Sequence, residues 1–261
     1  MRRAPIVVSC CYLFAASTLL FGAASGTTPS STGTTATTLL NQLSTAFSGG
    51  NVVHQVQLTG NATWQVGSLN DSGTATLSAA STGSAQLQLS LSASGQRTES
   101  QSGEGINLSC TWTGADGTTH AIDPGNCWRP VLWFLPPLSL QPSLLSSSLG
   151  AVDLGTGKVG FGTAAFRHLQ SQLVLPDMSS ALASTMMQRS TADLGLDPTS
   201  LLPAVLAYTI WPDNGAAIPI LIEIHYANYQ LINGVQIPFT IQRYINGSLE
   251  LQIAVTSAQA N

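Results

Sequence analysis

Apolar and polar residues alternate with a period of two through the last third of the chain. Residues 220–226, 235–241 and 249–255 each carry a large apolar side chain at every second position, which is typical of strands with one buried face. Asn-Gly pairs at 233–234 and 246–247 separate these stretches, and Asn-Gly is the strongest short signal for a two-residue hairpin. The pattern predicts an antiparallel meander of three strands.

A second alternating region lies nearer the N-terminus. Residues 74–79 and 84–93 alternate, and the longer stretch has Ala and Leu on one face and Ser and Gln on the other, which predicts a half-buried antiparallel strand. Before them, residues 38–47 carry apolar side chains at helical spacing, with Thr38 as the cap and a Gly-Gly pair as the stop. Residues 177–190 predict a further helix.

The first residues have the layout of an export signal. Two arginines precede an apolar run of about 16 residues, and small residues follow around Ala24. This run is shorter than the roughly 20 residues that span a bilayer, so we expect a signal peptide over 1–24 that is cleaved near Ala24 rather than kept as an anchor. Residues 25–37 are rich in Ser, Thr and Gly, typical of a flexible linker, and 38–261 form one domain.

The composition excludes disorder and nucleic-acid binding. Hydrophobic residues make up 44% of the chain and charged residues only 8%, against roughly a quarter charged in typical proteins. Disordered chains lack this apolar content. Without the two arginines of the signal, six basic residues stand against twelve acidic ones, so the counterion release that drives nucleic-acid affinity is not available.

Two cysteines remain after removal of the signal. Cys110 and Cys127 form an even pair in an oxidising compartment, which predicts a disulfide; two free buried thiols are the alternative. Closing a loop of this length contributes about 3 kcal/mol in the chain-entropy account. Zinc needs three or four clustered ligands, and only His120 lies nearby, so no metal site is expected.

Two segments then resemble a known family. Residues 226–239 (YANYQLINGVQIPF) resemble the closing hairpin of outer-membrane lipoprotein-carrier proteins, and residues 196–203 (LDPTSLLP) resemble the turn before that family's late strands. A helix that runs into a first strand over 39–58 also fits its layout. The resemblance implies a mainly β fold, a strongly curved antiparallel sheet or incomplete β-barrel with short helices as a lid. It further implies a cavity for acyl chains, in the periplasm or cell envelope of a bacterium.

An aromatic and apolar stretch at residues 128–145 is the candidate for that lid. It places two tryptophans, a phenylalanine and several leucines between prolines, and Pro136-Pro137 prevents a continuous helix. The alternative is a loop buried in the core. Basic residues are scarce, so Arg97 and Arg129 are the candidates for hydrogen bonds across the lid. The candidate lid residues are Trp128, Trp133, Phe134 and Leu135.

No catalytic or cofactor motif has the context that its chemistry requires. Residues 155–160 match G-x-G-x-x-G, but their flanks are β-like and no βαβ unit surrounds them, so a glycine-rich turn is expected. Glu223 and His225 share a strand face, and Asp193 and Asp197 form a carboxylate pair. Such pairs occur in any chain with twelve acidic residues, and we predict no catalytic, cofactor or metal site.

The expected function is therefore binding. We expect an exported, non-enzymatic envelope protein that binds an apolar or acyl ligand in a half-barrel cavity and that has an envelope protein as partner. One alternative is a ligand-free structural or interaction β-domain of the envelope, and another is an exported hydrolase. A continuous apolar cavity favours the carrier, whereas a filled core favours the structural domain.

Overall fold

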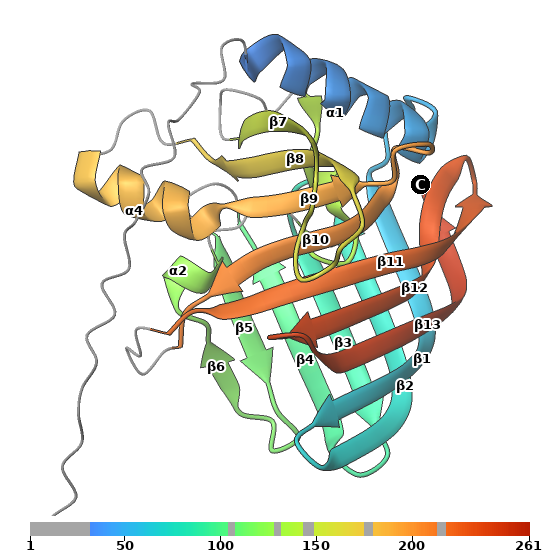
Figure 1. Ribbon diagram of the computed structural model, residues 1–261. Coiled ribbons are helices and arrows are strands. Elements are labelled where there is room, and N and C mark those ends of the chain that lie inside the picture. Colours follow the sequence, from blue (N-terminus) through green and yellow to red (C-terminus); the bar gives the residue numbers. More distant parts are fainter. Residues whose placement is uncertain (1–31, 104–107, 128–131, 143–148, 175–179, 213–217) are drawn as a thin grey trace, which may run out of the picture. The chain divides into compact units, whose positions relative to one another are not determined.

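The computed structural model describes most of the chain beyond the predicted signal peptide (Figure 1). The residues that it describes are 32–103, 108–127, 132–142, 149–174, 180–212 and 218–261. The predicted signal at 1–24 lies outside these ranges.

Thirteen strands form one antiparallel sheet. Their order is β6-β5-β4-β3-β2-β1-β13-β12-β11-β10-β9-β8-β7, and β6 and β7 are the two edges, so the described sheet is not closed into a barrel. The predicted fold class, mainly β with an incomplete barrel, is confirmed. The strands are β1 (Gln55–Val66), β2 (Leu69–Ala80), β3 (Ala85–Leu91), β4 (Gly95–Ser102), β5 (Ser109–Thr113), β6 (Thr119–Ala121), β7 (Leu149–Gly157), β8 (Phe166–Leu173), β9 (Ala192–Leu196), β10 (Pro203–Ile210), β11 (Ile220–Ile232), β12 (Val235–Ile245) and β13 (Ser248–Ala260).

The C-terminal meander follows the predicted pattern. β11 pairs with β12 and β12 with β13, each antiparallel. The hairpin residues Asn233 and Gly234 have φ of 50° and 84°, and Asn246 and Gly247 have φ of 48° and 81°. Two successive positive φ angles are the geometry of the type I′ turn, which matches the twist of the flanking strands. Both predicted Asn-Gly hairpins are confirmed.

The described residues also form four helices: α1 (Thr32–Ser48), α2 (Pro124–Cys127), α3 (Pro136–Ser139) and α4 (Ser180–Ser190). α1 packs against β7, β12 and α3, while α4 packs against β8 and α2. Helix α1 begins six residues before the predicted cap Thr38, inside the stretch predicted as a linker. The reason is Ala36, which is buried and extends the apolar stripe of Leu39, Leu40 and Leu43 by one turn. None of the described helices has the length and apolarity to cross a membrane.

The core lies on the inner face of the curved sheet. Leu58, Leu77 and Leu87 lie side by side on β1, β2 and β3 and are at most 1% exposed. A second row lies on β9, β10 and β11 and is fully buried; its members are Leu194, Leu206 and Ile224. In Figure 1, β2–β5 lie behind β9–β13. Side chains of α1 and of the segment 132–140 fill the space within this sheet.

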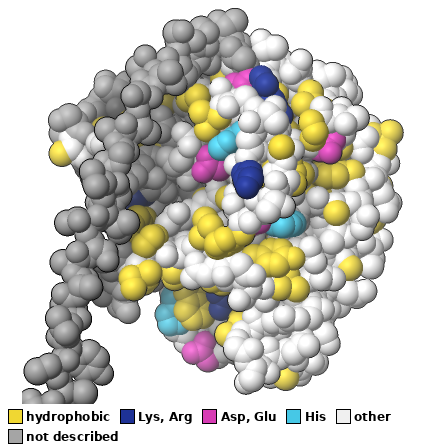
Figure 2. Space-filling model, viewed as in Figure 1, with side chains coloured by type: hydrophobic (Ala, Val, Ile, Leu, Met, Phe, Trp, Pro, Cys, Tyr) yellow, Lys and Arg dark blue, Asp and Glu magenta, His cyan; other side chains and the backbone are white. Residues whose placement is uncertain are grey.

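The outer face carries a small second cluster. Val159 packs on Val205 and Ala207, so the turn after β7 lies over β10. Gly160 in this turn has φ +69°, and a Cβ at this position would lie 2.2 Å from a carboxylate oxygen of Glu223. The G-x-G-x-x-G stretch is thus the end of β7 and a turn, with no helix after it, as predicted. Figure 2 shows only scattered charged side chains on this side.

Candidate functional site

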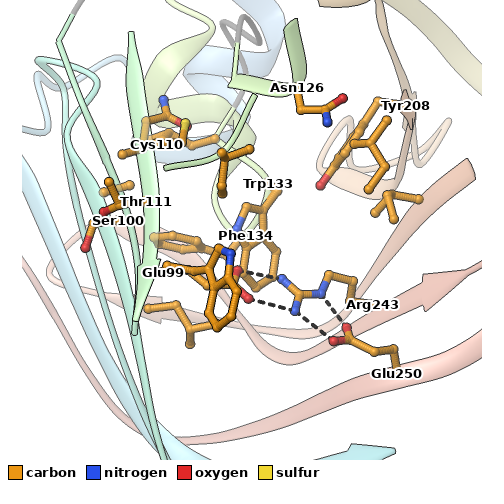
Figure 3. Close-up of a pocket in the computed structure, with 18 of the residues that line it drawn as sticks. Glu99, Ser100, Cys110, Thr111, Asn126, Trp133, Phe134, Tyr208, Arg243 and Glu250 are labelled. Atoms are coloured by element: carbon orange, nitrogen blue, oxygen red, sulfur yellow. Dashed lines mark hydrogen bonds and ion pairs between the residues drawn. The ribbon is translucent and has the colours of Figure 1, made fainter. Parts of the chain in front are cut away.

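A cavity of about 360 Å³ lies between the two flanks of the sheet (Figure 3). Strands β3, β4 and β5 contribute to one wall and β10, β11 and β12 to the other. Ligand pockets in proteins span roughly 300–1,000 Å³ and are mostly apolar, so this cavity has the size of a small ligand site. Apolar lining residues from both walls include Leu87, Ile122, Ile210, Ile220, Ile222 and Ile245.

The segment with the predicted lid residues forms a further wall of this pocket. Leu132, Trp133 and Phe134 line it, and Trp133 meets Phe134 edge-on with ring centroids 5.3 Å apart. Phe134 and Leu135 are only 1% exposed and belong to the core. The segment therefore fills the core with one side and lines the pocket with the other. Two predicted residues, Trp128 and Arg129, lie outside the described residues.

A cluster of charged side chains lies at the base of the pocket. Arg243 on β12 donates from Nε to Glu250 Oε2 at 2.6 Å and from Nη1 to Glu99 Oε2 at 2.9 Å. Its Nη2 reaches Glu99 Oε1 at 3.2 Å and Glu250 Oε1 at 3.1 Å. Figure 3 shows both carboxylates turned toward the guanidinium. Because Glu99 lies on β4, this cluster joins the two flanks across the interior.

Strand pairing and a β-bulge place the charged side chains of this cluster beside each other. Arg243 lies opposite Ile224 on β11, so it points to the inner face. The register of β12 and β13 shifts between Arg243 and Tyr244, which leaves Glu250 as an extra residue beside Arg243. Such a bulge turns a side chain away from its regular direction. The bulge thus brings the Glu250 carboxylate beside Arg243.

Both partners of this ion pair are strongly held in the charged form. Burial raises the pKa of Glu99, but the charge of Arg243 and its hydrogen bonds outweigh burial and lower the pKa to about 2. Burial lowers the pKa of Arg243, while Glu99 and Glu250 raise it well above its ordinary value. Neither group therefore titrates near neutral pH.

Arg97, a predicted lid contact, lines the same pocket. Its Nε donates to Glu99 at 3.3 Å, and its guanidinium lies 4.8 Å from the ring of Trp112 and 5.9 Å from that of Trp64. Trp64 in turn donates from Nε1 to Glu250 at 2.9 Å. Arg97 thus contacts a carboxylate on its own strand and two aromatic rings, Trp112 on the neighbouring β5 and Trp64 on β1.

Arg243 and Tyr226 contact the predicted lid segment directly. The Arg243 guanidinium lies 4.9 Å from the ring centre of Trp133, and the Tyr226 hydroxyl donates to the Trp133 carbonyl. Burial raises the pKa of Tyr226, which keeps the hydroxyl as a donor. The sequence reasoning missed Arg243. The available signal was an arginine two residues after Ile241, on the apolar face of a predicted strand.

Helix α2 contributes Asn126 to the lining of the pocket. The predicted disulfide between Cys110 and Cys127 is present, with Cα atoms 5.7 Å apart, and ties α2 to β5. Asn126 donates from Nδ2 to the Trp211 carbonyl at 2.6 Å, and the Trp211 N–H donates to Asn126 Oδ1 at 2.7 Å. Trp211 follows β10 directly. The short helix therefore connects the two walls of the pocket.

Two histidine–carboxylate pairs lie on the outer face. Glu223 accepts hydrogen bonds from His225 and from the Phe161 N–H, and His168 contacts Asp193 at 2.8 Å. Asp197 accepts the N–H groups of the turn at 199–200, as expected for a turn residue. Within the described parts of the chain, no three His, Cys, Asp or Glu side chains are grouped to hold a metal ion.

Comparison with solved structures finds this fold in distant proteins, among them the following two. A DUF1329 family protein from Desulfovibrio piger aligns with a TM-score of 0.54 and 8% identity, over 87% of this chain and 92% of that one. A candidate outer membrane lipoprotein-sorting protein domain from Vibrio parahaemolyticus aligns with a TM-score of 0.52 and 10% identity, over 87% and 93%. No family model and no curated protein match the sequence. The resemblance to lipoprotein-sorting proteins is therefore confirmed for the fold.

Proposed function

We propose that this chain is an envelope protein that binds an apolar or acyl ligand in the pocket between the two flanks of its sheet. The observation that carries the proposal is the cavity of about 360 Å³ with a mostly apolar lining. Burial of hydrocarbon there supplies about 0.8 kcal/mol per methylene. The shared fold with a candidate lipoprotein-sorting domain supports the same assignment.

Export follows from the N-terminal residues. The apolar run and small residues at 1–24 have the layout of a cleaved signal, and the domain begins in α1 at Thr32. A carrier of apolar ligands needs a donor and an acceptor, so we place the protein in the bacterial envelope with a protein partner that receives the ligand.

Binding fits the pocket better than catalysis does. General acid–base catalysis needs groups whose pKa lies near the working pH. Glu99 has its pKa lowered to about 2, and the pKa of Arg243 is raised well above its ordinary value. Both charges are engaged with each other and not poised for proton transfer. This favours a carrier over an exported hydrolase, and the cavity favours it over a ligand-free structural domain.

The test is direct binding by protein produced with its own N-terminus. Native mass spectrometry of the exported protein gives the mass after cleavage near Ala24 and reveals co-purified lipid. Titration with the uncharged fluorophore N-phenyl-1-naphthylamine then measures pocket occupancy. We expect saturable binding that Ile220→Trp weakens by about tenfold or more, since Ile220 lines the pocket and an indole there occupies its volume.

Leu221→Trp is the matched control. Leu221 is the next residue on β11 and packs with the outer cluster around Val205, so the same substitution leaves the pocket open. Binding that neither variant changes would place the fluorophore elsewhere and refute the proposal. Absence of any saturable binding together with absence of co-purified lipid would refute it as well.

A further inference from the structure

We propose that the pocket selects an alkyl or acyl chain with an uncharged head group and rejects a free carboxylate. This inference rests on the proposed function and specifies its ligand class. It is carried by the charged cluster at the base of the pocket, where Arg243, Glu99 and Glu250 meet Arg97.

The formal charges of this cluster cancel. Among the described residues that line the pocket, the cations are Arg97 and Arg243 and the anions are Glu99 and Glu250. All four are connected, because Glu99 contacts both arginines and Arg243 contacts both glutamates. An incoming anion would be a third carboxylate for two guanidinium groups. The pocket thus holds no net positive charge for an acidic head group.

The N–H donors of Arg243 and the Nε–H of Arg97 are directed at these two glutamates. A guanidinium has five N–H donors, and the structure has four N–H···O contacts from Arg243 to Glu99 and Glu250. The Arg243 guanidinium lies over the ring of Trp133, and Arg97 donates to Glu99 with Trp112 beside it. Even the Trp64 N–H donates to Glu250. A ligand carboxylate would have to displace a resident one from Arg243, and at Arg97 it would compete with Glu99, which already accepts the Nε–H.

The cost of burial then decides between ligands. An ionised carboxylate that leaves water without a partner loses far more free energy than an alcohol or ester does. Both kinds of ligand gain the same hydrocarbon contact with Leu132, Ile222 and the other apolar lining residues. The hydrocarbon chain of the ligand supplies the affinity, and the charged cluster, which has no net charge, supplies the selection against a charged head group.

The experiment compares two ligands of equal chain length. Dodecanol and dodecanoate compete against N-phenyl-1-naphthylamine for the purified mature protein at a pH well above the carboxyl pKa. We expect dodecanol to bind at least about tenfold more tightly. Glu99→Gln leaves one net positive charge at the base of the pocket, so we expect this preference to shrink to about threefold or less, or to reverse, through tighter dodecanoate binding.

Asp193→Asn is the matched control. It removes the same charge from the protein, but on the outer face beside His168, so the preference for dodecanol is expected to stay as in the unmodified protein. Glu250→Gln repeats the test at the second carboxylate if Glu99→Gln does not fold.

The outcomes separate this inference from the proposed function. If the unmodified protein binds both ligands equally, or dodecanoate more tightly, the pocket is a carrier site without this selection and the inference is wrong. If neither ligand nor fluorophore binds, the proposed function itself fails. If Asp193→Asn shifts the preference as much as Glu99→Gln, overall charge and not the cluster is responsible.

Discussion

The charged groups of the inner face and those of the outer face are organised differently. Inside, Arg243 joins Glu99 and Glu250 across the pocket, and Glu99 is 144 residues away in the sequence. Outside, His225 contacts Glu223 on the same strand, two residues away, and His168 contacts Asp193, 25 residues away. The inner cluster links distant flanks of the sheet, whereas the outer pairs link neighbours.

The carboxylates of the two faces also have different partners, arginine on the inner face and histidine on the outer face. Arginine stays charged at every physiological pH and matches two carboxylates with its planar fork, whereas histidine changes its charge near neutrality. The inner cluster is therefore a permanent brace of the pocket wall. The outer pairs serve local structure, since Glu223 also accepts the Phe161 N–H and so holds the turn after β7 on the sheet. The proposed selection of ligand and the attachment of the turn thus involve opposite faces of the sheet.

The largest expected effect is the loss of the central cation of the inner cluster. Arg243→Met leaves Glu99 and Glu250 close together without their common partner, and removal of one member of a buried pair costs about 3–5 kcal/mol. We expect a loss of this size in the free energy of unfolding, measured by urea denaturation. A pocket that has lost its brace is also expected to bind N-phenyl-1-naphthylamine more weakly.

Arg97→Met is the comparison for this variant. The Arg97 side chain is 29% exposed and has one ionic partner, against 10% exposed and two partners for Arg243. An ion pair of this kind contributes about 1 kcal/mol or less. Equal losses in the free energy of unfolding of the two variants would show that the central position of Arg243 does not make it more important for stability than Arg97.

Local patterns explain why much of the fold was predictable. The two Asn-Gly turns and the alternation around them depend only on near neighbours, and both hairpins formed where the sequence placed them. The start of α1 was not predictable in this way. Ala36 is a weak apolar signal in a Thr-rich stretch, and it joins the helix because it is buried in the folded protein.

The pocket was less predictable because its partners are remote. The apolar content of the segment at 132–135 indicated burial, but a lid and a core loop have the same composition, and the segment serves both as core and as wall. Arg97 was singled out because cations are rare, and it does line the pocket. Arg243 passed unnoticed, since its partner Glu99 comes from another flank and Glu250 reaches it through a bulge.

A medium effect is expected on the outer face, at the turn that Glu223 holds. Gly160→Ala places a Cβ 2.2 Å from the Glu223 carboxylate at φ +69°, so the turn must move. The left-handed backbone alone costs about 1–2 kcal/mol for a residue with a Cβ. We expect a loss of about 2 kcal/mol in the free energy of unfolding, with fluorophore binding unchanged because the pocket lies on the other face.

Gly157→Ala tests whether this loss is specific. A Cβ at Gly157 has its nearest neighbour at 3.8 Å, the Nδ1 atom of His168, and therefore fits without displacement. Stability close to that of the unmodified protein is expected. If Gly160→Ala also weakened fluorophore binding, the turn on the outer face would affect the pocket, and the two faces would not act independently.

The smallest expected effect is the pH dependence of the outer pair. Burial raises the pKa of Asp193, but the hydrogen bonds from His168 and Gln170 and the charge of His168 together outweigh burial and lower the pKa below its ordinary 3.8. A lowered pKa in the folded state gives stability that is present above the ordinary value and is lost as pH falls below it. Asp193→Asn is therefore expected to lower the free energy of unfolding by about 1 kcal/mol or less near neutral pH. The difference in stability from the unmodified protein is expected to narrow below about pH 4. Glu99→Gln is expected to show a larger loss of stability, which narrows as the pH falls from about 4.5 toward about 2. Urea denaturation across this pH range measures the stability of both variants. If Asp193→Asn lost as much stability as Glu99→Gln, the outer pair would contribute as much to folding as the inner cluster.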